Sequence, residues 1–95
     1  MSVYMICDVT VKDAEALSSY LKLAQPTLSA FEGKFHVQAG DVHVFEGTWN
    51  PKVVIVVEFP SLENAHSWYH SKEYKAALAI KPTAMDRNMI VVQGI

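Results

Sequence analysis

The chain has one cysteine, four glycines and no excess of basic residues in its 95 positions. The single cysteine, Cys7, excludes an internal disulfide and fits a reducing compartment. Eight basic against ten acidic residues give a formal net charge of −2, and no basic patch is visible, so we do not expect nucleic acid as a partner. The dispersed glycines exclude a phosphate-cradling loop.

No stretch has the length and composition of a membrane span, which needs about 18 apolar residues. The first residues, MSVYMICDV, lack the basic start and long apolar core of a signal peptide. We therefore expect a cytoplasmic protein with no membrane contact, and one domain over residues 1–95.

Hydrophobic residues make up 51% of the chain, and its mean hydropathy is +0.12. A domain this small hides only about two-thirds of its unfolded surface. The apolar excess therefore favours a subunit interface, and we expect a homodimer.

The clearest element is Val53 to Val57, five consecutive β-branched residues that predict a strand covered on both faces. Pro60 ends this strand. Ser61 and Ser71 are suitable N-caps for two short helices, with Pro82 just beyond the end of the second.

The earlier part of the chain predicts a strand over Val3–Val9 and a helix capped by Thr10 or Asp13. Pro26 is expected to kink this helix or to begin a second segment. Gly33 is the expected C′ residue. The helix carries one apolar stripe at a spacing near 3.6, made of Leu17, Tyr20, Leu21, Ala24, Leu28 and Phe31.

Two segments alternate, Lys34–Ala39 and Val42–Glu46. The first places Phe35 and Val37 on one face and His36 and Gln38 on the other. Gly40 is a turn or a bulge, so these segments are either a hairpin or one long bent strand. The last predicted strand is Arg87–Ile95.

This order of elements predicts an α+β fold of the ferredoxin-like βαββαβ type, with an extra short strand or a bulged second strand. Helices cover one face of the sheet. A second copy of the chain is the simplest cover for the other face, which gives a dimeric α+β barrel.

The chain resembles the family called domain of unknown function 1330, in the dimeric α+β barrel superfamily. The resemblance rests on FEGKFHV, EGTWNPKVVIVVEFPS, AHSWYHSKEY and the closing IVVQG. It implies a homodimer of two packed sheets. Superfamily relatives include cofactor-free monooxygenases, small isomerases and haem-degrading proteins.

The chain departs from this family at two places. The family often has two glycines where this chain has Glu32 and Gly33, and an arginine near Gln38. The family also often has a basic residue before the last strand, for which Lys81 and Arg87 are candidates.

Four charged or titratable residues form a candidate catalytic row. With the strand order 4-1-3-2, and with the first and third strands taken as parallel, Asp8 and Glu58 would lie side by side. His36 would approach Glu58, and Arg87 would approach Asp8. Two close carboxylates beside a histidine could serve acid–base chemistry; the alternative is solvated charges or a structural ion pair.

Large amphipathic side chains are candidates for a ligand pocket. The proposed ligand-binding set is Tyr20, Gln38, Trp49, Trp68, Tyr69, Tyr74 and Arg87, and the proposed catalytic set is Asp8, His36 and Glu58. The alternative for the aromatic residues is a role in the core or in dimer contacts.

No metal site and no cofactor are expected. His66 and His70 have the i, i+4 spacing of metal ligands, but no third ligand is evident. Cys7 lies among apolar residues and is expected to be a small core residue. Haem bound by His36 or His43 is a third alternative for function.

The sequence therefore predicts a homodimer that binds a small apolar or aromatic organic molecule. Whether it is an enzyme of the cofactor-free oxygenase or isomerase type, or a non-catalytic binding or structural module, stays open at this point.

Overall fold

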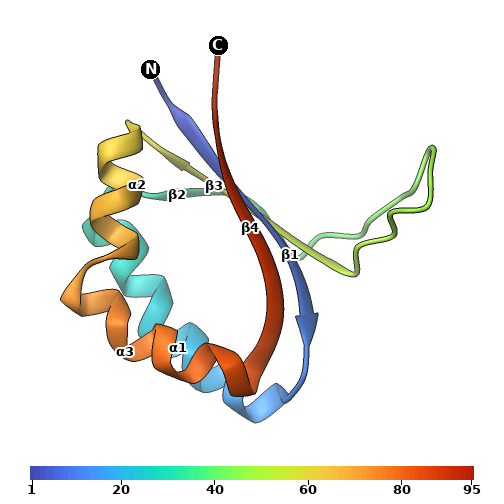
Figure 1. Cartoon of the computed structure of the whole chain (residues 1–95), viewed down its shortest axis with the longest axis horizontal. Coiled ribbons are helices and arrows are strands. Elements are labelled where there is room, and N and C mark those ends of the chain that lie inside the picture. The colour runs from blue at the N-terminus through green and yellow to red at the C-terminus, as the bar shows by residue number, and fades with distance from the viewer.

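The computed structural model describes all 95 residues, and it contains four strands and three helices. In chain order these are β1 (Val3–Val11), α1 (Ala14–Ala30), β2 (Lys34–Gln38), β3 (Val53–Phe59), α2 (Leu62–Tyr69), α3 (Lys72–Ala84) and β4 (Met85–Gln93). The three helices lie on one side of a curved sheet (Figure 1). The sheet order is β2-β3-β1-β4 and all pairs are antiparallel. The predicted α+β, ferredoxin-like fold is confirmed.

The expectation that the first and third strands are parallel is wrong. β1 and β3 are antiparallel neighbours, because β3 returns against β2, which runs parallel to β1. Asp8 lies opposite Val54, and Glu58 lies opposite Tyr4. The two carboxylates are therefore four residues apart along the strands, or roughly 13 Å at about 3.3 Å per residue.

The two faces of the sheet have different surroundings. Val3, Met5, Cys7 and Val9 alternate along β1 and are all buried beneath the helices. Tyr4, Ile6 and Asp8 point to the other face, together with Ile90 and Val92 of β4. We call this second surface the outer face. No helix covers it (Figure 1).

Helix α1 runs from Ala14 to Ala30 with Pro26 inside it, so Pro26 does not begin a second segment. The Asp13 carboxylate accepts from the backbone N–H groups of Glu15 and Ala16, which confirms it as the N-cap. The backbone N–H of Glu32 donates to Ser29 and that of Gly33 to Leu28, the pattern of a Schellman motif.

The C′ residue of this motif is Glu32 and not Gly33 as predicted. Glu32 has φ 65°, in the left-handed region. Gly33 is needed for a different reason: a Cβ there would lie 3.0 Å from the Leu28 carbonyl oxygen and 3.1 Å from the Phe59 ring. The prediction placed the left-handed residue at the glycine, one residue too far along.

Helix α3 continues past the predicted boundary at Pro82 to Ala84. The last carbonyls of α3 are satisfied from the connection between β1 and α1: the backbone N–H of Lys12 donates to the Ala84 carbonyl, and the Lys12 ammonium donates to the Pro82 carbonyl. Strand β4 consequently begins at Met85, two residues before the prediction. None of the helices has both the length and the hydrophobicity that crossing a membrane requires.

The second strand contains a bulge, at His36 and not at Gly40. Phe35 pairs with Val57 and Val37 pairs with Val56, so the pairing shifts by one residue between them. The bulge inverts the alternation. Phe35 and Gln38 face the helices, whereas Val37 shares the register of the outer face.

Residues 39–52 form an arm with no strand in it, so the predicted strand Val42–Glu46 is wrong. The arm projects from the sheet on the side away from the helices (Figure 1). At its start, the backbone N–H of Ala39 still donates a hydrogen bond to the Val54 carbonyl of β3. Phe45 is 95% exposed and Trp49 64%. Alternation predicts a strand only where another strand supplies hydrogen bonds, and none lies beside the arm.

Candidate functional site

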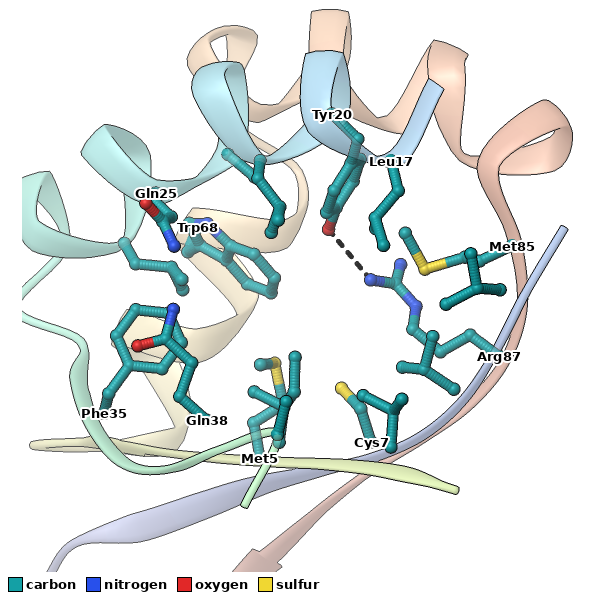
Figure 2. Close-up of a pocket in the computed structure, with 18 residues that line it drawn as sticks. Met5, Cys7, Leu17, Tyr20, Gln25, Phe35, Gln38, Trp68, Met85 and Arg87 are labelled. Carbon is teal, nitrogen blue, oxygen red and sulfur yellow. Dashed lines mark hydrogen bonds between the residues drawn. The ribbon is translucent and has the colours of Figure 1, made fainter. Parts of the chain in front are cut away.

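A largely apolar cavity lies between α1 and the inner face of the sheet (Figure 2). Its volume is about 190 Å³, and 15 of its 18 lining residues are hydrophobic. The polar members are Gln25, Gln38 and Arg87, with the hydroxyl of Tyr20. The inner positions of β1 and β3 supply the floor, and the apolar stripe of α1 supplies the roof.

The bulge in β2 places Gln38 in this cavity. In an unbroken strand, Gln38 would lie on the opposite face from Phe35. With the extra residue at His36, both side chains line the cavity. Gln25 of α1 and Gln38 lie toward the same end of the cavity, away from Arg87 (Figure 2).

Arg87 and Tyr20 line the other end of the cavity, and both form hydrogen bonds with Tyr74; we call these three residues the Arg87 cluster. The Arg87 guanidinium donates through Nη1 to the Tyr20 hydroxyl at 2.9 Å and through Nη2 to the Tyr74 hydroxyl at 3.1 Å. The two hydroxyl oxygens are 2.5 Å apart and share a hydrogen bond. The guanidinium also lies 5.7 Å from the centre of the Tyr20 ring.

Charge states in and beside the cavity follow from burial. Desolvation raises the pKa of the Cys7 thiol, and the positive charge of Arg87 offsets this only in part. Burial, followed by the adjacent Tyr20, raises the pKa of Tyr74 above its ordinary value. Burial opposes the charge of Arg87, but Tyr20 and Tyr74 outweigh it, and the pKa of Arg87 is raised. The cluster therefore holds a cation and a neutral Tyr74.

The cavity wall at Trp68 is held in place by hydrogen bonds and ring packing. The Trp68 indole donates to the Thr27 hydroxyl at 3.0 Å, and that hydroxyl donates to the Ala24 carbonyl. The ring centres of Trp68 and Tyr74 are 4.1 Å apart. Since Trp68 and Tyr74 are almost fully buried, this wall is preformed.

The predicted ligand-binding residues fall into three groups. Tyr20, Gln38, Trp68 and Arg87 line the cavity. Tyr74 does not line it but holds Arg87. Tyr69 and Trp49 lie elsewhere: Tyr69 packs beside Trp68 away from the cavity, and the Trp49 indole donates to Asp8 at 2.8 Å on the outer face.

The predicted row of Arg87, Asp8, Glu58 and His36 is wrong as an arrangement. One of its contacts is correct, the hydrogen bond of 2.6 Å between His36 Nε2 and Glu58 Oε1. That pair lies on the outer face. Asp8 is four positions away along the sheet, and Arg87, opposite Val9, points to the inner face. The two carboxylates therefore form no shared site.

The His36–Glu58 pair is solvent-accessible, with 40% and 28% of the side chains exposed. The nearby Ser2 side chain and the His36 ring lower the pKa of the Glu58 carboxyl. Asp8, His36 and Glu58 thus lie outside the cavity. Gln25 was missed by sequence reasoning, because a glutamine beside a helix proline carries no signal of a ligand site.

No group of three or more metal-ligating side chains occurs in the structure. The rings of His66 and His70 stack with centres 6.2 Å apart, and neither lines the cavity between α1 and the sheet. His43 lies exposed in the arm.

The model of the family described as Domain of unknown function (DUF1330) matches residues 2–95. The chain belongs to this family. The family is described as a domain of unknown function, so membership of DUF1330 identifies relatives but not a reaction. No curated protein matches the chain closely enough to count as a relative.

Solved structures share the fold at low identity. A protein of unknown function from Rhodopseudomonas palustris is 19% identical with a TM-score of 0.83, over 99% of this chain and 82% of that one. A dimeric ferredoxin-like protein from Bacteroides fragilis is 12% identical, with a TM-score of 0.65 over 98% and 96%. SnoaB, a cofactor-independent oxygenase from Streptomyces nogalater, is 10% identical, with a TM-score of 0.68 over 99% and 93%.

Proposed function

We propose that this DUF1330 protein is a homodimer in which each protomer binds a small apolar or aromatic organic molecule in the cavity beneath α1. The observation that carries the proposal is the preformed cavity with 15 hydrophobic residues among 18. An apolar cavity of about 150 Å³ accommodates benzene. A volume of about 190 Å³ suits a ligand built on one ring.

The homodimer is supported by the outer face. Ile90 is 58% exposed and Val92 46%, and the arm adds Phe45 and Trp49 on the same side. Large apolar side chains that stay exposed on an uncovered sheet face support an interaction site there. The Bacteroides fragilis neighbour is described as dimeric, and a second copy of this chain presents a matching apolar surface by symmetry.

Catalysis of the cofactor-free oxygenase or isomerase type is a second candidate, suggested by the fold shared with SnoaB. Such chemistry needs a base with a pKa near the working pH. No histidine or carboxylate lines the cavity, the pKa values of Cys7 and Tyr74 are raised, and Arg87 is a cation. His36 and Glu58 lie on the outer face. Binding without turnover is therefore favoured.

Tryptophan fluorescence tests the proposal because the two tryptophans report on different places. In Trp49→Phe, the remaining Trp68 lies in the cavity wall. Titration with toluene should produce a saturable change in Trp68 emission. In Trp68→Phe, the remaining Trp49 lies on the outer face, and its emission should not change.

A pair of cavity variants provides the control. Ala24→Phe places a ring in the cavity and should abolish the response to toluene, whereas Leu23→Phe, on the exposed side of α1, should retain it. Circular dichroism checks that both variants fold. Toluene binding that survives in Ala24→Phe, or a response confined to Trp49, would refute the cavity as the ligand site.

A further inference from the structure

The Arg87 guanidinium is a cation at the end of an apolar cavity, and it has no carboxylate partner. The two ion pairs of the chain are Lys12 with Asp86 and His36 with Glu58. Asp86 precedes Arg87 in β4 and therefore points to the opposite face of the sheet. A charge held among apolar residues is costly unless it is paired, so this cation calls for an anion from outside the chain.

The hydrogen-bond count of the cluster points the same way. A guanidinium has five N–H donors and no acceptor. Two of these donors serve the Tyr20 and Tyr74 hydroxyls, which leaves three. Of the two tyrosine O–H groups, one donates to the other hydroxyl, and the other has no acceptor in the chain. The cluster thus presents spare donors and no compensating acceptor.

The tyrosines also fix where the spare donors lie. Their oxygens, 2.5 Å apart and each bonded to a different Nη atom, hold the guanidinium in one orientation. Since the raised pKa keeps Tyr74 protonated, neither the Tyr74 hydroxyl nor the neighbouring Cys7 thiol, whose pKa is also raised, neutralises the cation. Figure 2 shows the guanidinium directed from β4 into the cavity toward Tyr20.

The opposite end of the cavity is polar but uncharged. Gln25 and Gln38 lie there, across the apolar lining from Arg87 (Figure 2). An amide can donate to or accept from a neutral hydroxyl or carbonyl group. The cavity is therefore charged at one end, apolar in the middle and neutral-polar at the other end.

We propose that the Arg87 cluster is a carboxylate receptor, and that the ligand of this protein is a small organic acid with an apolar body of about one ring. The carboxylate accepts from the free N–H groups of Arg87 and from the O–H of Tyr20, with the Tyr74 O–H donating to the Tyr20 oxygen. Tyr74 acts as a positioning residue, because it touches the guanidinium and not the cavity. This inference rests on the proposed binding function and adds the chemical class of the ligand.

The test compares benzoate with benzamide, which has nearly the same shape and no charge. In the Trp49→Phe protein, read out by Trp68 emission, benzoate should bind at least tenfold more tightly than benzamide. Arg87→Met should reduce benzoate affinity to that of benzamide and leave benzamide affinity unchanged. Arg87→Lys keeps the charge without the planar fork and should retain part of the preference.

The outcomes separate the two proposals. Equal affinity for benzoate and benzamide in the protein with Arg87 intact would overturn the carboxylate receptor while the cavity stays a binding site, and this comparison needs no Arg87 variant to fold. Failure of benzoate, benzamide and toluene alike to bind would overturn the binding function itself. Equal losses of benzoate and benzamide affinity in Arg87→Met would also refute the receptor, because they would indicate a structural role.

Discussion

Glu32 holds a backbone conformation that a side chain rarely adopts. Its φ is 65°, and it closes α1 as the C′ residue of the Schellman motif. A non-glycine residue in this region costs roughly 1–3 kcal/mol. The side chain recovers a part of the cost by accepting from the Asn64 amide at 3.2 Å.

We expect Glu32→Gly to stabilise the protein by about 1 kcal/mol, because glycine adopts positive φ without steric cost. Glu32→Ala, which loses the same carboxylate but keeps a Cβ, should not stabilise it. Urea unfolding followed by circular dichroism measures both. A stability of Glu32→Gly at or below that of Glu32→Ala would show that the left-handed conformation carries no strain.

Glu58 supplies a prediction on pH. The Ser2 side chain and then the His36 ring lower its pKa from an ordinary value of about 4.5. Ser2→Ala and His36→Ala should each raise the pKa of Glu58, as measured by carbon NMR of the glutamate side chains. Ser18→Ala, on the exposed surface of α1, is the matched control and should leave it unchanged.

The sign of the stability effect follows from the lowered pKa. Since the folded state holds the Glu58 carboxylate more favourably than the unfolded chain, the stabilisation is present above the unfolded pKa. It is lost as pH falls through the lower, folded value. Ser2→Ala should therefore be less stable than the parent protein at neutral pH, and the two should converge in acid. A difference that grows in acid would contradict this account.

At the scale of elements, the caps hold the site together. The Ser71 hydroxyl accepts from the Tyr74 backbone N–H at 3.1 Å at the start of α3. Tyr74 is the third residue of that helix and positions Arg87. A cap in this place therefore fixes one part of the Arg87 cluster.

We expect Ser71→Ala to destabilise the protein by about 1 kcal/mol, the usual cost of a lost N-cap. Ser71→Asp should restore most of this, because its carboxylate accepts from the same N–H. Thermal and urea unfolding measure the effect. Ser67→Ala, inside α2 and away from its N-cap Ser61, is the control. If Ser71→Ala and Ser67→Ala were equally stable, the cap would have no role.

Elements were predictable from sequence where local patterns determine them. The β-branched run of β3, the Asp13, Ser61 and Ser71 caps and the apolar stripe of α1 all depend on neighbouring residues. The prediction of a strand over Val42–Glu46 was wrong because an alternating sequence does not by itself provide a neighbouring strand to pair with. The bulge at His36 was not predicted because it depends on the register of β2 against β3.

The candidate site was harder to predict because it depends on strand direction. Taking β1 and β3 as parallel placed Asp8 beside Glu58, and the antiparallel sheet separates these two residues. The approach of Arg87 to Asp8 was predicted from the neighbouring positions of the first and last strands. Those strands do pair, but Arg87 lies opposite Val9 and therefore points to the inner face. Chemical character was still informative: Tyr20, Gln38, Trp68 and Arg87 line the cavity. The same criterion also selected Trp49, Tyr69 and Tyr74, which do not line the cavity, so only the topology shows which of the selected residues meet.

At the scale of the whole molecule, one face of the sheet is packed and the other is open. Helices bury the inner positions, while Ile90 of β4 stays 58% exposed on the outer face. We expect Ile90→Asp to weaken the proposed dimer by at least tenfold, because it places a charge in the apolar contact. Analytical ultracentrifugation should then show 10.6 kDa monomers at concentrations where the parent protein is dimeric.

Leu23→Asp is the control for this prediction. Leu23 is 42% exposed on α1, on the helix side of the molecule, so the substitution should leave the dimer intact. A parent protein that is monomeric throughout, or an Ile90→Asp protein as dimeric as the Leu23→Asp protein, would show that the outer face is not the subunit interface.

The central claim is that the ligand lies between α1 and the inner face of the sheet. The most direct measurement is methyl NMR of the protein during titration with benzoate. We expect shifts and intermolecular contacts at the methyl groups of Leu17, Val53 and Met85, which line the cavity, and none at Ile90 and Val92 of the outer face. Contacts confined to Ile90 and Val92, with the cavity methyl groups unmoved, would contradict the account.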